Sequence, residues 1–194
     1  MSSRAEILAS LKANQPATRA LPEDLENPVI FESPVSVFAT MLTNIGGSAV
    51  EVSGFEEIKT YLKEHFSGLP RIISTLPELS DVTERDWIDH EPHSYENVDL
   101  AIIAAHFGVA ENSALWITES LMQQRVIPFI CQQLAVVVRK TDILSNMHQA
   151  YTRIADSSYG FGTFIAGPSK TADIEQSLVL GAHGPKNMTV FLVD

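Results

Sequence analysis

Two glycine-containing segments of the sequence carry side chains that bind anions or transfer protons. The first begins at Gly167, reads GPSKTADIE and follows a predicted strand. It is expected to open a helix, and the free backbone N–H groups at a helix start attract carboxylate or phosphate groups. Ser169, Lys170 and Thr171 add hydrogen-bond donors at the same place. This combination predicts an anion-binding pocket.

The same segment also fits a purely structural role. Thr171 can act as the N-cap residue of the predicted helix, with Asp173 and Glu175 in its first turn, where acids are favourable. These two carboxylates would also oppose a bound phosphate. The G-x-x-x-x-G-K-[ST] spacing of a Walker phosphate loop is absent from the segment. An anion pocket and a helix cap therefore both stay open.

The second segment reads GAHGPK, and its glycines, Gly181 and Gly184, predict a tight turn around His183. The pKa of an imidazole lies near neutrality, so His183 can act as a general acid or base, or as a metal ligand. A histidine that hydrogen-bonds the backbone of its own turn is the alternative.

A third segment, His106–Ser113, follows the strongest predicted strand, Val98–Ala105. Its Glu111 is a candidate nucleophile or general base, because a carboxylate in a loop at a strand end can attack an acyl group. A solvated loop glutamate is the alternative. In open α/β sheets, ligands bind outside the carboxyl ends of the strands. The loops expected to form such a site follow Ala105, Thr118 and Ala166.

Neither a metal nor another cofactor is predicted from the remaining residues. Asp89–His93 reads DHEPH, but Pro92 disfavours a helix there, and a metal site needs three or four converging ligands. Cys131 is the single cysteine, whereas an iron–sulfur cluster needs about four protein thiolates. One thiol also cannot form an internal disulfide, which fits a reducing compartment. Because Cys131 follows the apolar stretch Val126–Ile130, we expect an inert core thiol, with a nucleophile as the alternative.

The elements that position these residues alternate between strands and helices. A first helix is expected from Ser3, with an apolar stripe of Ile7, Leu8 and Leu11, and residues 1–32 form this helix and a linker. Residues 33–194 are expected to form one mainly parallel, three-layer α/β domain. Its strands are predicted at 48–52, 71–74, 98–105, 114–118, 134–138, 163–166 and 188–193. Its helices are predicted from Pro34, after Ser53, after Thr141 and at 172–178.

Composition and charge narrow the choice of partners. The chain has 194 residues, of which 45% are hydrophobic and 19% charged, as expected of one globular domain. Its formal net charge of −11 argues against binding to nucleic acid or to an anionic membrane surface. The start of the chain lacks the apolar core of a secretory signal, and no apolar run approaches the length of a membrane helix. We therefore predict a soluble, cytoplasmic protein.

The stretch GPSKTADIEQSLVLGAHGPKNMTVFLVD resembles the terminal signature of the lactate utilization protein C family, whose members carry a LUD domain. The segment GVAENSALWIT resembles the GxAETG-type segment of the family, and Glu111 fills its glutamate position. The sequence departs from the family there, because Asn112, Ser113 and Ala114 stand where Thr-Gly-Thr is more usual. The resemblance covers residues 98–194 and, more loosely, the whole chain.

The resemblance implies the type of fold shared by sugar-phosphate isomerases, CoA transferases and formyltetrahydrofolate cyclo-ligases. It also implies a three-protein system that oxidises L-lactate to pyruvate, in which the other two proteins carry the iron–sulfur clusters. We therefore expect an accessory, non-redox subunit that binds these iron–sulfur partners and a small carboxylate or phosphate. In this role Ser169, Lys170 and Thr171 hold the anion, while His183 orients it or shuttles a proton.

Two other functions stay open at this point. The first is a stand-alone acyl-transfer enzyme, or one that depends on a nucleotide or CoA, with Glu111 as its nucleophile. The second is a scaffold in which the signature residues only shape turns and caps. An exposed first helix also makes a homo-oligomer an expectation.

Overall fold

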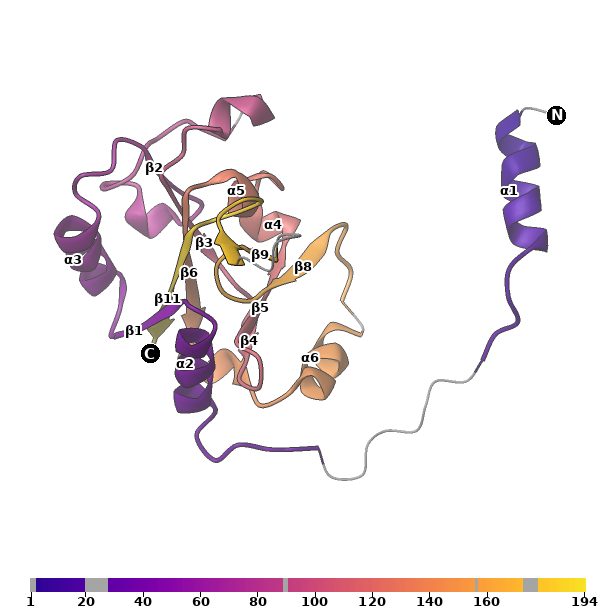
Figure 1. Cartoon of the computed structure of the whole chain (residues 1–194), viewed down its shortest axis with the longest axis horizontal. Coiled ribbons are helices and arrows are strands. Elements are labelled where there is room, and N and C mark those ends of the chain that lie inside the picture. Colours follow the sequence, from indigo (N-terminus) through magenta and orange to yellow (C-terminus); the bar gives the residue numbers. More distant parts are fainter. Residues whose placement is uncertain (1–2, 20–27, 89–90, 156, 173–177) are drawn as a thin grey trace.

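A five-stranded, entirely parallel sheet forms the centre of the molecule (Figure 1). The computed structural model describes residues 3–19, 28–88, 91–155, 157–172 and 178–194. The strand order is β1-β11-β6-β3-β2. The strands are β1 (Ser48–Val52), β2 (Ile72–Ser74), β3 (Leu100–Ala104), β6 (Gln133–Arg139) and β11 (Asn187–Val193). The predicted α/β class with a mainly parallel sheet is therefore confirmed. The strand predicted to be central is β3, which lies next to the edge strand β2, whereas β6 is the middle strand.

Both faces of this sheet are buried, and alternate residues of each strand serve opposite faces. On β6, Val136 packs in a cluster with Phe38 and Leu42 of helix α2 (Pro34–Asn44). Its neighbour Val137 packs in a separate cluster with Ile58 and Leu62 of helix α3 (Phe55–His65). The two helices therefore cover opposite faces, which gives the three layers expected from the alternating sequence. The short helices α4 (Glu119–Met122) and α5 (Ile127–Ile130) pack on the α2 face.

A second, four-stranded sheet lies against the α2 face, in the order β7-β4-β5-β8. Its strands are β4 (Phe107–Val109), β5 (Ala114–Thr118), β7 (Ile143–Leu144) and β8 (Gly162–Ile165). β5 runs antiparallel to both β4 and β8. Leu115 and Ile117 of β5 face the main core, while Trp116 faces helix α6 (Met147–Ile154) on the other side. The sequence predicted β5 and β8 as strands but not their separation into a second sheet.

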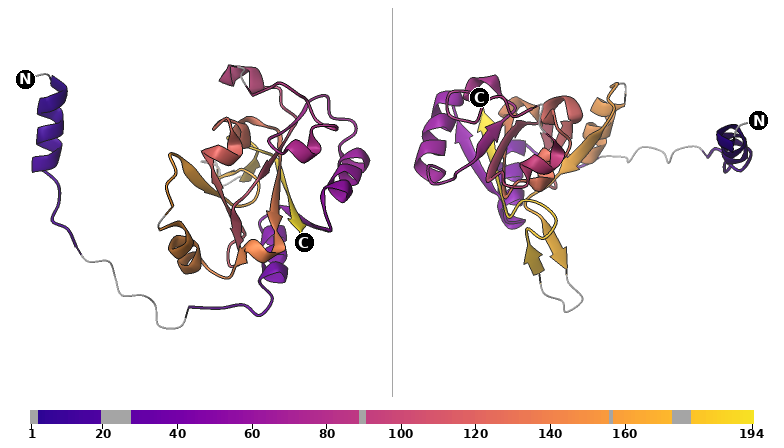
Figure 2. Two further views of the ribbon diagram at one scale, coloured as in Figure 1. Left: turned by 180° about the vertical axis from the view of Figure 1, so that it is seen from behind. Right: turned by 90° about the horizontal axis from the view of Figure 1, so that it is seen from above.

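One helix prediction is wrong, and another falls mostly on residues outside the described ranges. The two ends of the helix predicted at 172–178 lie on β9 (Lys170–Ala172) and β10 (Leu178–Leu180), which pair as an antiparallel hairpin. This hairpin projects from the body, as the right view of Figure 2 shows. Residues 173–177, including Asp173, lie outside the described residues. The helix expected directly after Thr141 begins only at Met147, since Ile143–Leu144 joins the second sheet as β7 and Asn146 caps the helix instead. The Asn146 side chain accepts a hydrogen bond from Gln149 N at 3.0 Å.

The predicted first helix is present as α1 (Ser3–Ala13), and all of its residues are exposed. It lies apart from the body in Figure 1. Its apolar stripe is uncovered, since Ile7, Leu8 and Leu11 are 53–62% exposed. The chain meets the body again just before α2, where Asn146 Nδ2 donates to Val29 O at 2.8 Å. The division into residues 1–32 and 33–194 stays a prediction.

Side-chain hydrogen bonds hold the long connection between β2 and β3 against the body. It contains 3-10 helices at Pro77–Leu79 and Pro92–Tyr95, and another such helix follows β6 at Lys140–Asp142. Trp87 is 2% exposed and its indole N–H donates to Ser74 O at 3.2 Å. Arg71 Nε bonds Glu84 Oε2 at 2.7 Å. The sequence predicted a surface connection. The buried Trp87 and the partly buried Arg71–Glu84 pair fix its path.

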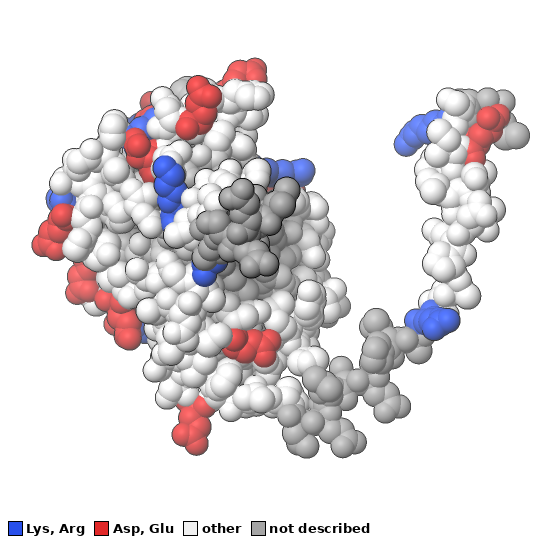
Figure 3. All heavy atoms as spheres, in the orientation of Figure 1, with Lys and Arg blue, Asp and Glu red and all other residues white. Residues whose placement is uncertain are grey.

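The surface reflects the acidic composition. Acidic side chains are spread over the face shown in Figure 3 and do not gather in one patch. Within the described ranges, no helix is both long and apolar enough to span a bilayer.

Candidate functional site

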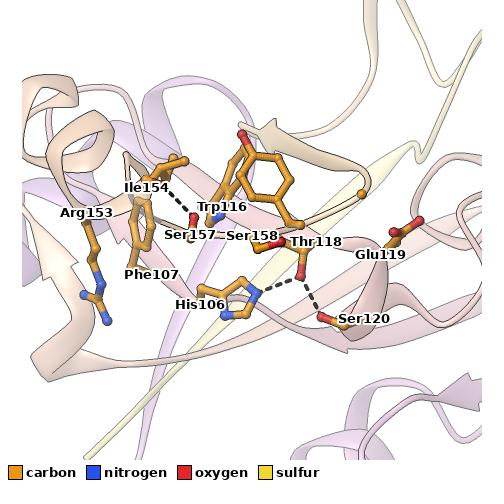
Figure 4. A pocket seen from close by; sticks show the side chains of 12 residues that line it. His106, Phe107, Trp116, Thr118, Glu119, Ser120, Arg153, Ile154, Ser157 and Ser158 are labelled. Carbon is orange, nitrogen blue, oxygen red and sulfur yellow. Dashed lines mark hydrogen bonds between the residues drawn. The ribbon is translucent and has the colours of Figure 1, made fainter.

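A pocket of about 430 Å³ opens where the second sheet meets α6 (Figure 4). It begins at the carboxyl end of β3, where the chain leaves the main sheet and enters β4. Its wall comes from β4, β5, α4, α6 and the loop between α6 and β8. The lining residues are His106, Phe107, Trp116, Thr118, Glu119, Ser120, Arg153, Ile154, Ser157, Ser158, Tyr159 and Gly160. The volume lies in the range typical of small-molecule sites.

Three polar side chains form a hydrogen-bonded chain along one wall of the pocket. His106 Nε2 lies 2.7 Å from Thr118 Oγ1, which in turn lies 2.8 Å from Ser120 Oγ. Thr118 is 6% exposed and ends β5, so its position is fixed by the sheet. Burial lowers the pKa of His106, and the positive charge of Arg153 lowers it further. The lowered pKa favours the neutral imidazole, and its Nδ1 is left as a donor or an acceptor according to the tautomer.

Two ion pairs frame the pocket. Arg153 Nη2 bonds Asp142 Oδ1 at 2.7 Å, and its guanidinium lies 5.1 Å from the centre of the Phe107 ring. This bond uses one of the five N–H donors of Arg153, and no second hydrogen bond of this side chain is found among the described residues, which leaves donors for a ligand. Glu119 Oε2 accepts from Arg125 Nε at 2.8 Å. The pairing neutralises Glu119 and reduces its repulsion of an anion in the pocket.

The remaining wall is aromatic and depends on close packing at Gly162. The Trp116 ring lies 5.1 Å from Tyr159 and 4.8 Å from Phe164, centre to centre. A Cβ atom at Gly162 would lie 2.5 Å from the Trp116 ring, so only glycine lets the indole occupy this place. The pocket thus offers hydrogen-bonding groups and a cation on one side and an apolar surface on the other. This arrangement suits a small polar molecule that has an apolar part.

The two glycine-containing segments singled out in the sequence lie side by side. Ser169 N donates to Pro185 O at 2.9 Å, and Gly181 N donates to Ser169 O at 3.1 Å. A Cβ atom at Gly184 would lie 3.1 Å from Ser169 Cβ. His183 is exposed in the same turn. The folded chain therefore brings together segments that are separated in sequence.

The described residues of these segments do not include the helix start on which the predicted anion site depended. Lys170 and Thr171 lie on strand β9 instead. The segment packs instead against the end of α2. Gly167 has φ +68, and a Cβ there would lie 2.8 Å from Ile45 Cδ1. Lys170 Nζ lies 3.8 Å from the Cβ position of Gly46, near the C-terminal end of α2, where a cation is favourable.

Glu111 lies at a different place from His183, in the turn between β4 and β5. Its side chain is exposed, and Oε1 accepts a hydrogen bond from Met147 N at 2.8 Å. Met147 is the first residue of α6, so the carboxylate satisfies a backbone N–H that the helix leaves unpaired. The contact gives Glu111 a capping role and keeps it out of the lining of the pocket.

Glu111→Ala is expected to lower the free energy of unfolding by about 0.5–2 kcal/mol, because a helix-capping hydrogen bond is lost. Urea denaturation followed by circular dichroism measures this change. Glu111→Gln is the matched control, since its side-chain oxygen still accepts from Met147 N. Unchanged stability of Glu111→Ala would contradict the capping role, and loss of function in both variants would favour a nucleophilic Glu111.

Cys131 is buried, as the sequence predicted, with 1% of its surface exposed. Burial raises the pKa of its thiol to about 12. At pH 8 the reactive thiolate is then about one part in ten thousand of the thiol. A disulfide reagent that releases a coloured thiol is expected to label the native protein very slowly and the guanidinium-unfolded protein rapidly. Fast labelling of the native protein would show that Cys131 is accessible and reopen a nucleophilic role.

Sequence reasoning located part of the pocket and missed the rest. The loops after Ala105 and Thr118 do line it, as the strand-end rule predicted, whereas the loop after Ala166 leads to the hairpin. Arg153 and residues 157–160 were missed, because α6 packs on the second sheet and the antiparallel pairing of β5 with β8 brings the loop between them to the pocket. The polar run Ser157-Ser158-Tyr159-Gly160 ahead of a strand is the signal that pointed there.

The segment Asp89–His93 is only partly described, because residues 89 and 90 lie outside the described ranges. His93 is on the 3-10 helix Pro92–Tyr95. Across the part of the chain that the structure describes, no three histidine, cysteine or acidic side chains converge as metal ligands do.

Named relatives align with half or more of this sequence. The sequence profile of the LUD domain matches residues 80–193. Lactate utilization protein C of Bacillus pumilus is 28% identical over 175 residues, which cover 84% of this chain and 70% of that protein. The protein of the same name from Oceanobacillus iheyensis is 30% identical over 105 residues, which cover 51% of this chain and 45% of that protein. The chain thus spans about half the length of the second relative.

The fold is also found in a solved structure. The crystal structure of a DUF162 family protein from Deinococcus radiodurans superposes with a TM-score of 0.66 at 16% sequence identity. The superposition covers 86% of this chain and all 100% of that one. At this identity the likeness concerns the fold alone. With the profile match over residues 80–193, the chain belongs to the LUD domain family.

Proposed function

We propose that this chain acts in lactate utilization as a non-redox accessory subunit that binds a small carboxylate and works with iron–sulfur partner proteins in the cytoplasm. The observation that carries the proposal is the alignment with the Bacillus pumilus lactate utilization protein C over 84% of the chain. The chemistry of the chain agrees with a non-redox role. Its single cysteine is a buried thiol, and an iron–sulfur cluster needs about four thiolates.

We consider two places for the carboxylate. One is the pocket lined by His106 and Arg153. The other is the pair of adjoining turns, where Ser169, Lys170, Thr171 and His183 supply donors around Gly167, Gly181 and Gly184. Lys170 and Thr171 of the second place lie on a strand and not at a helix start. Its support is that the segments around Ser169 and His183 lie side by side.

The function is tested by growth on L-lactate as the sole carbon source. A deletion of the gene is compared with the same strain carrying the wild-type, His183→Ala or Glu111→Gln gene, with protein levels checked by immunoblot. We expect the deletion to stop growth and the wild-type gene to restore it. Normal growth of the deletion strain on lactate would contradict the proposed function. Purification of the tagged wild-type protein from lactate-grown cells is expected to recover proteins with iron–sulfur absorbance, and their absence would contradict the proposed partners.

The alternative of a stand-alone acyl-transfer or CoA-dependent enzyme has less support. It requires the Glu111 carboxylate as a nucleophile, and that carboxylate is engaged with Met147 N. Thermal shift measurements with CoA, ATP, lactate and pyruvate separate the two functions, since a ligand that binds only the folded state raises the melting temperature. Stabilisation by CoA or ATP alone would favour the enzyme.

Self-association is a further part of the proposal. The uncovered stripe of Ile7, Leu8 and Leu11 on α1 supports a homo-oligomer, because an apolar helix face gains free energy when it is buried. Light scattering of the full chain gives its mass in solution, and a monomer at all concentrations would contradict this part.

A further inference from the structure

We infer that the pocket lined by His106, Thr118, Ser120 and Arg153 binds a small organic acid that carries a hydroxyl or keto oxygen next to its carboxylate. The inference deepens the proposed function, and the choice of lactate and pyruvate among the probes rests on it. The class of ligand follows from the side chains that line the pocket.

The carboxylate is expected to meet Arg153. This side chain is held at the pocket by Asp142 and by the Phe107 ring, and it keeps donors beyond the one that Asp142 uses. Arginine N–H groups in this setting bind a carboxylate through charge-assisted hydrogen bonds. The negative charge of Glu119 is compensated by Arg125, so it offers little opposition.

The second oxygen of the ligand is expected to meet the chain His106–Thr118–Ser120. In Figure 4 the His106 ring lies between Arg153 and Thr118, so the cation and the hydroxyl groups follow one another along the same wall. Their internal hydrogen bonds, at 2.7 and 2.8 Å, fix the two hydroxyls without saturating them. The order of a cation followed by a neutral donor–acceptor chain corresponds to the order of a carboxylate followed by a hydroxyl or carbonyl oxygen in the ligand.

The rest of the ligand is expected to be apolar. Trp116 and Tyr159 form the opposite wall, and the pocket volume of about 430 Å³ exceeds what a three-carbon acid fills. A longer apolar side chain therefore gains contact that lactate does not make. We expect phenyllactate to bind at least about tenfold more tightly than lactate, because burying a phenyl group adds a hydrophobic contribution of that size.

The test is calorimetric titration of the purified full chain with L-lactate, pyruvate, phenyllactate, propionate and inorganic phosphate. Propionate lacks the second oxygen, so we expect it to bind at least about tenfold more weakly than lactate. Arg153→Gln and Thr118→Val are expected to weaken phenyllactate binding by about tenfold or more. Arg85→Gln is the matched control, since Arg85 is an exposed arginine in the connection before β3 and lies outside the pocket.

Thr118 and Arg153 also contribute to packing, so circular dichroism melts accompany each variant. If either variant does not fold, Ser120→Ala replaces it, because Ser120 is exposed and its loss removes only the end of the hydrogen-bonded chain. The inference is overturned if no 2-hydroxy or 2-keto acid binds the wild-type chain, or if propionate binds as tightly as lactate. It is also overturned if Lys170→Ala abolishes binding while the pocket variants retain it.

The two proposals fail in different ways. Normal lactate growth of the deletion strain, combined with binding of phenyllactate in the pocket, would remove the proposed function and keep the inference. A growth defect of the deletion strain, combined with no acid binding by the purified chain, would keep the function and remove the inference.

Discussion

Phe191→Ala is expected to lower the free energy of unfolding by about 3–5 kcal/mol, as truncation of a fully buried phenylalanine typically does. Phe191 lies on β11 and is fully buried. Its strand neighbours are Val50 of β1 and Val137 of β6, and its ring meets Tyr61 of α3 edge-on at 5.3 Å. Truncation removes the side chain that joins the sheet to α3 and leaves a cavity that these neighbours cannot fill.

Chemical denaturation with fluorescence or circular dichroism detection measures this loss. Phe129→Ala is the matched control, because Phe129 is 42% exposed and is expected to cost less than about 1 kcal/mol. Equal losses for the two variants would show that Phe191 does not have the central place in the core that the structure gives it.

Gly108→Val is expected to destabilise the protein by about 1–3 kcal/mol through overpacking. A Cβ atom at Gly108 would lie 2.7 Å from Ile143 Cδ1 and 2.9 Å from Phe38 Cε2. These side chains come from β7 and α2, so the glycine marks the place where α2 packs directly on the second sheet. Valine would push both side chains away and separate the two layers.

Thermal unfolding of Gly108→Val and of Gly68→Val tests this expectation. Gly68 is the control, because a Cβ atom there meets nothing within 4 Å. An unchanged melting temperature for Gly108→Val would mean that α2 and the second sheet do not pack as closely as described. Gly108→Ala is expected to fall between the two, since it adds the Cβ but not the branching methyl groups.

Local patterns predicted the elements whose signals lie within their own residues. Strand β1 occupies Ser48–Val52, the range expected from its short apolar pattern between glycines and a polar turn. Helix α2 begins at Pro34, where proline suits the first turn, although Ser33 makes no side-chain capping bond. In these cases, the residues that define the element also determine its ends.

Elements that depend on a distant partner were predicted less well. The segment after Gly167 carries the residues of a helix start, but its Thr171 pairs with Val179 across a hairpin. A helix-capping pattern contains no information about a strand partner further along the chain. The pocket was only partly foreseen for the same reason, since Trp116 and Thr118 meet residues 157–160 through the pairing of β5 with β8.

The turn at Ser113, where the resemblance led us to expect glycine, has an unusual backbone conformation. Ser113 is fully buried and has φ +53, a backbone conformation that glycine adopts most easily. Its hydroxyl donates to Asn112 O at 2.7 Å, and Asn112 Oδ1 accepts from Ala114 N at 3.0 Å. These local bonds support the turn in a conformation that serine rarely takes.

The strand order also constrains how the molecule assembles during translation. β1 finds its only sheet neighbour among the described strands in β11, with Ser48 opposite Thr189. The ribosome must therefore make more than a hundred further residues before β1 can pair, which takes on the order of ten seconds at ordinary elongation rates. Meanwhile, β3 and β6 can already pair, and the other edge of β6 stays unpaired until β11 has been made. An unpaired strand edge of this kind is a template for pairing with other chains, so the edge of β6 is exposed to aggregation until β11 has been made.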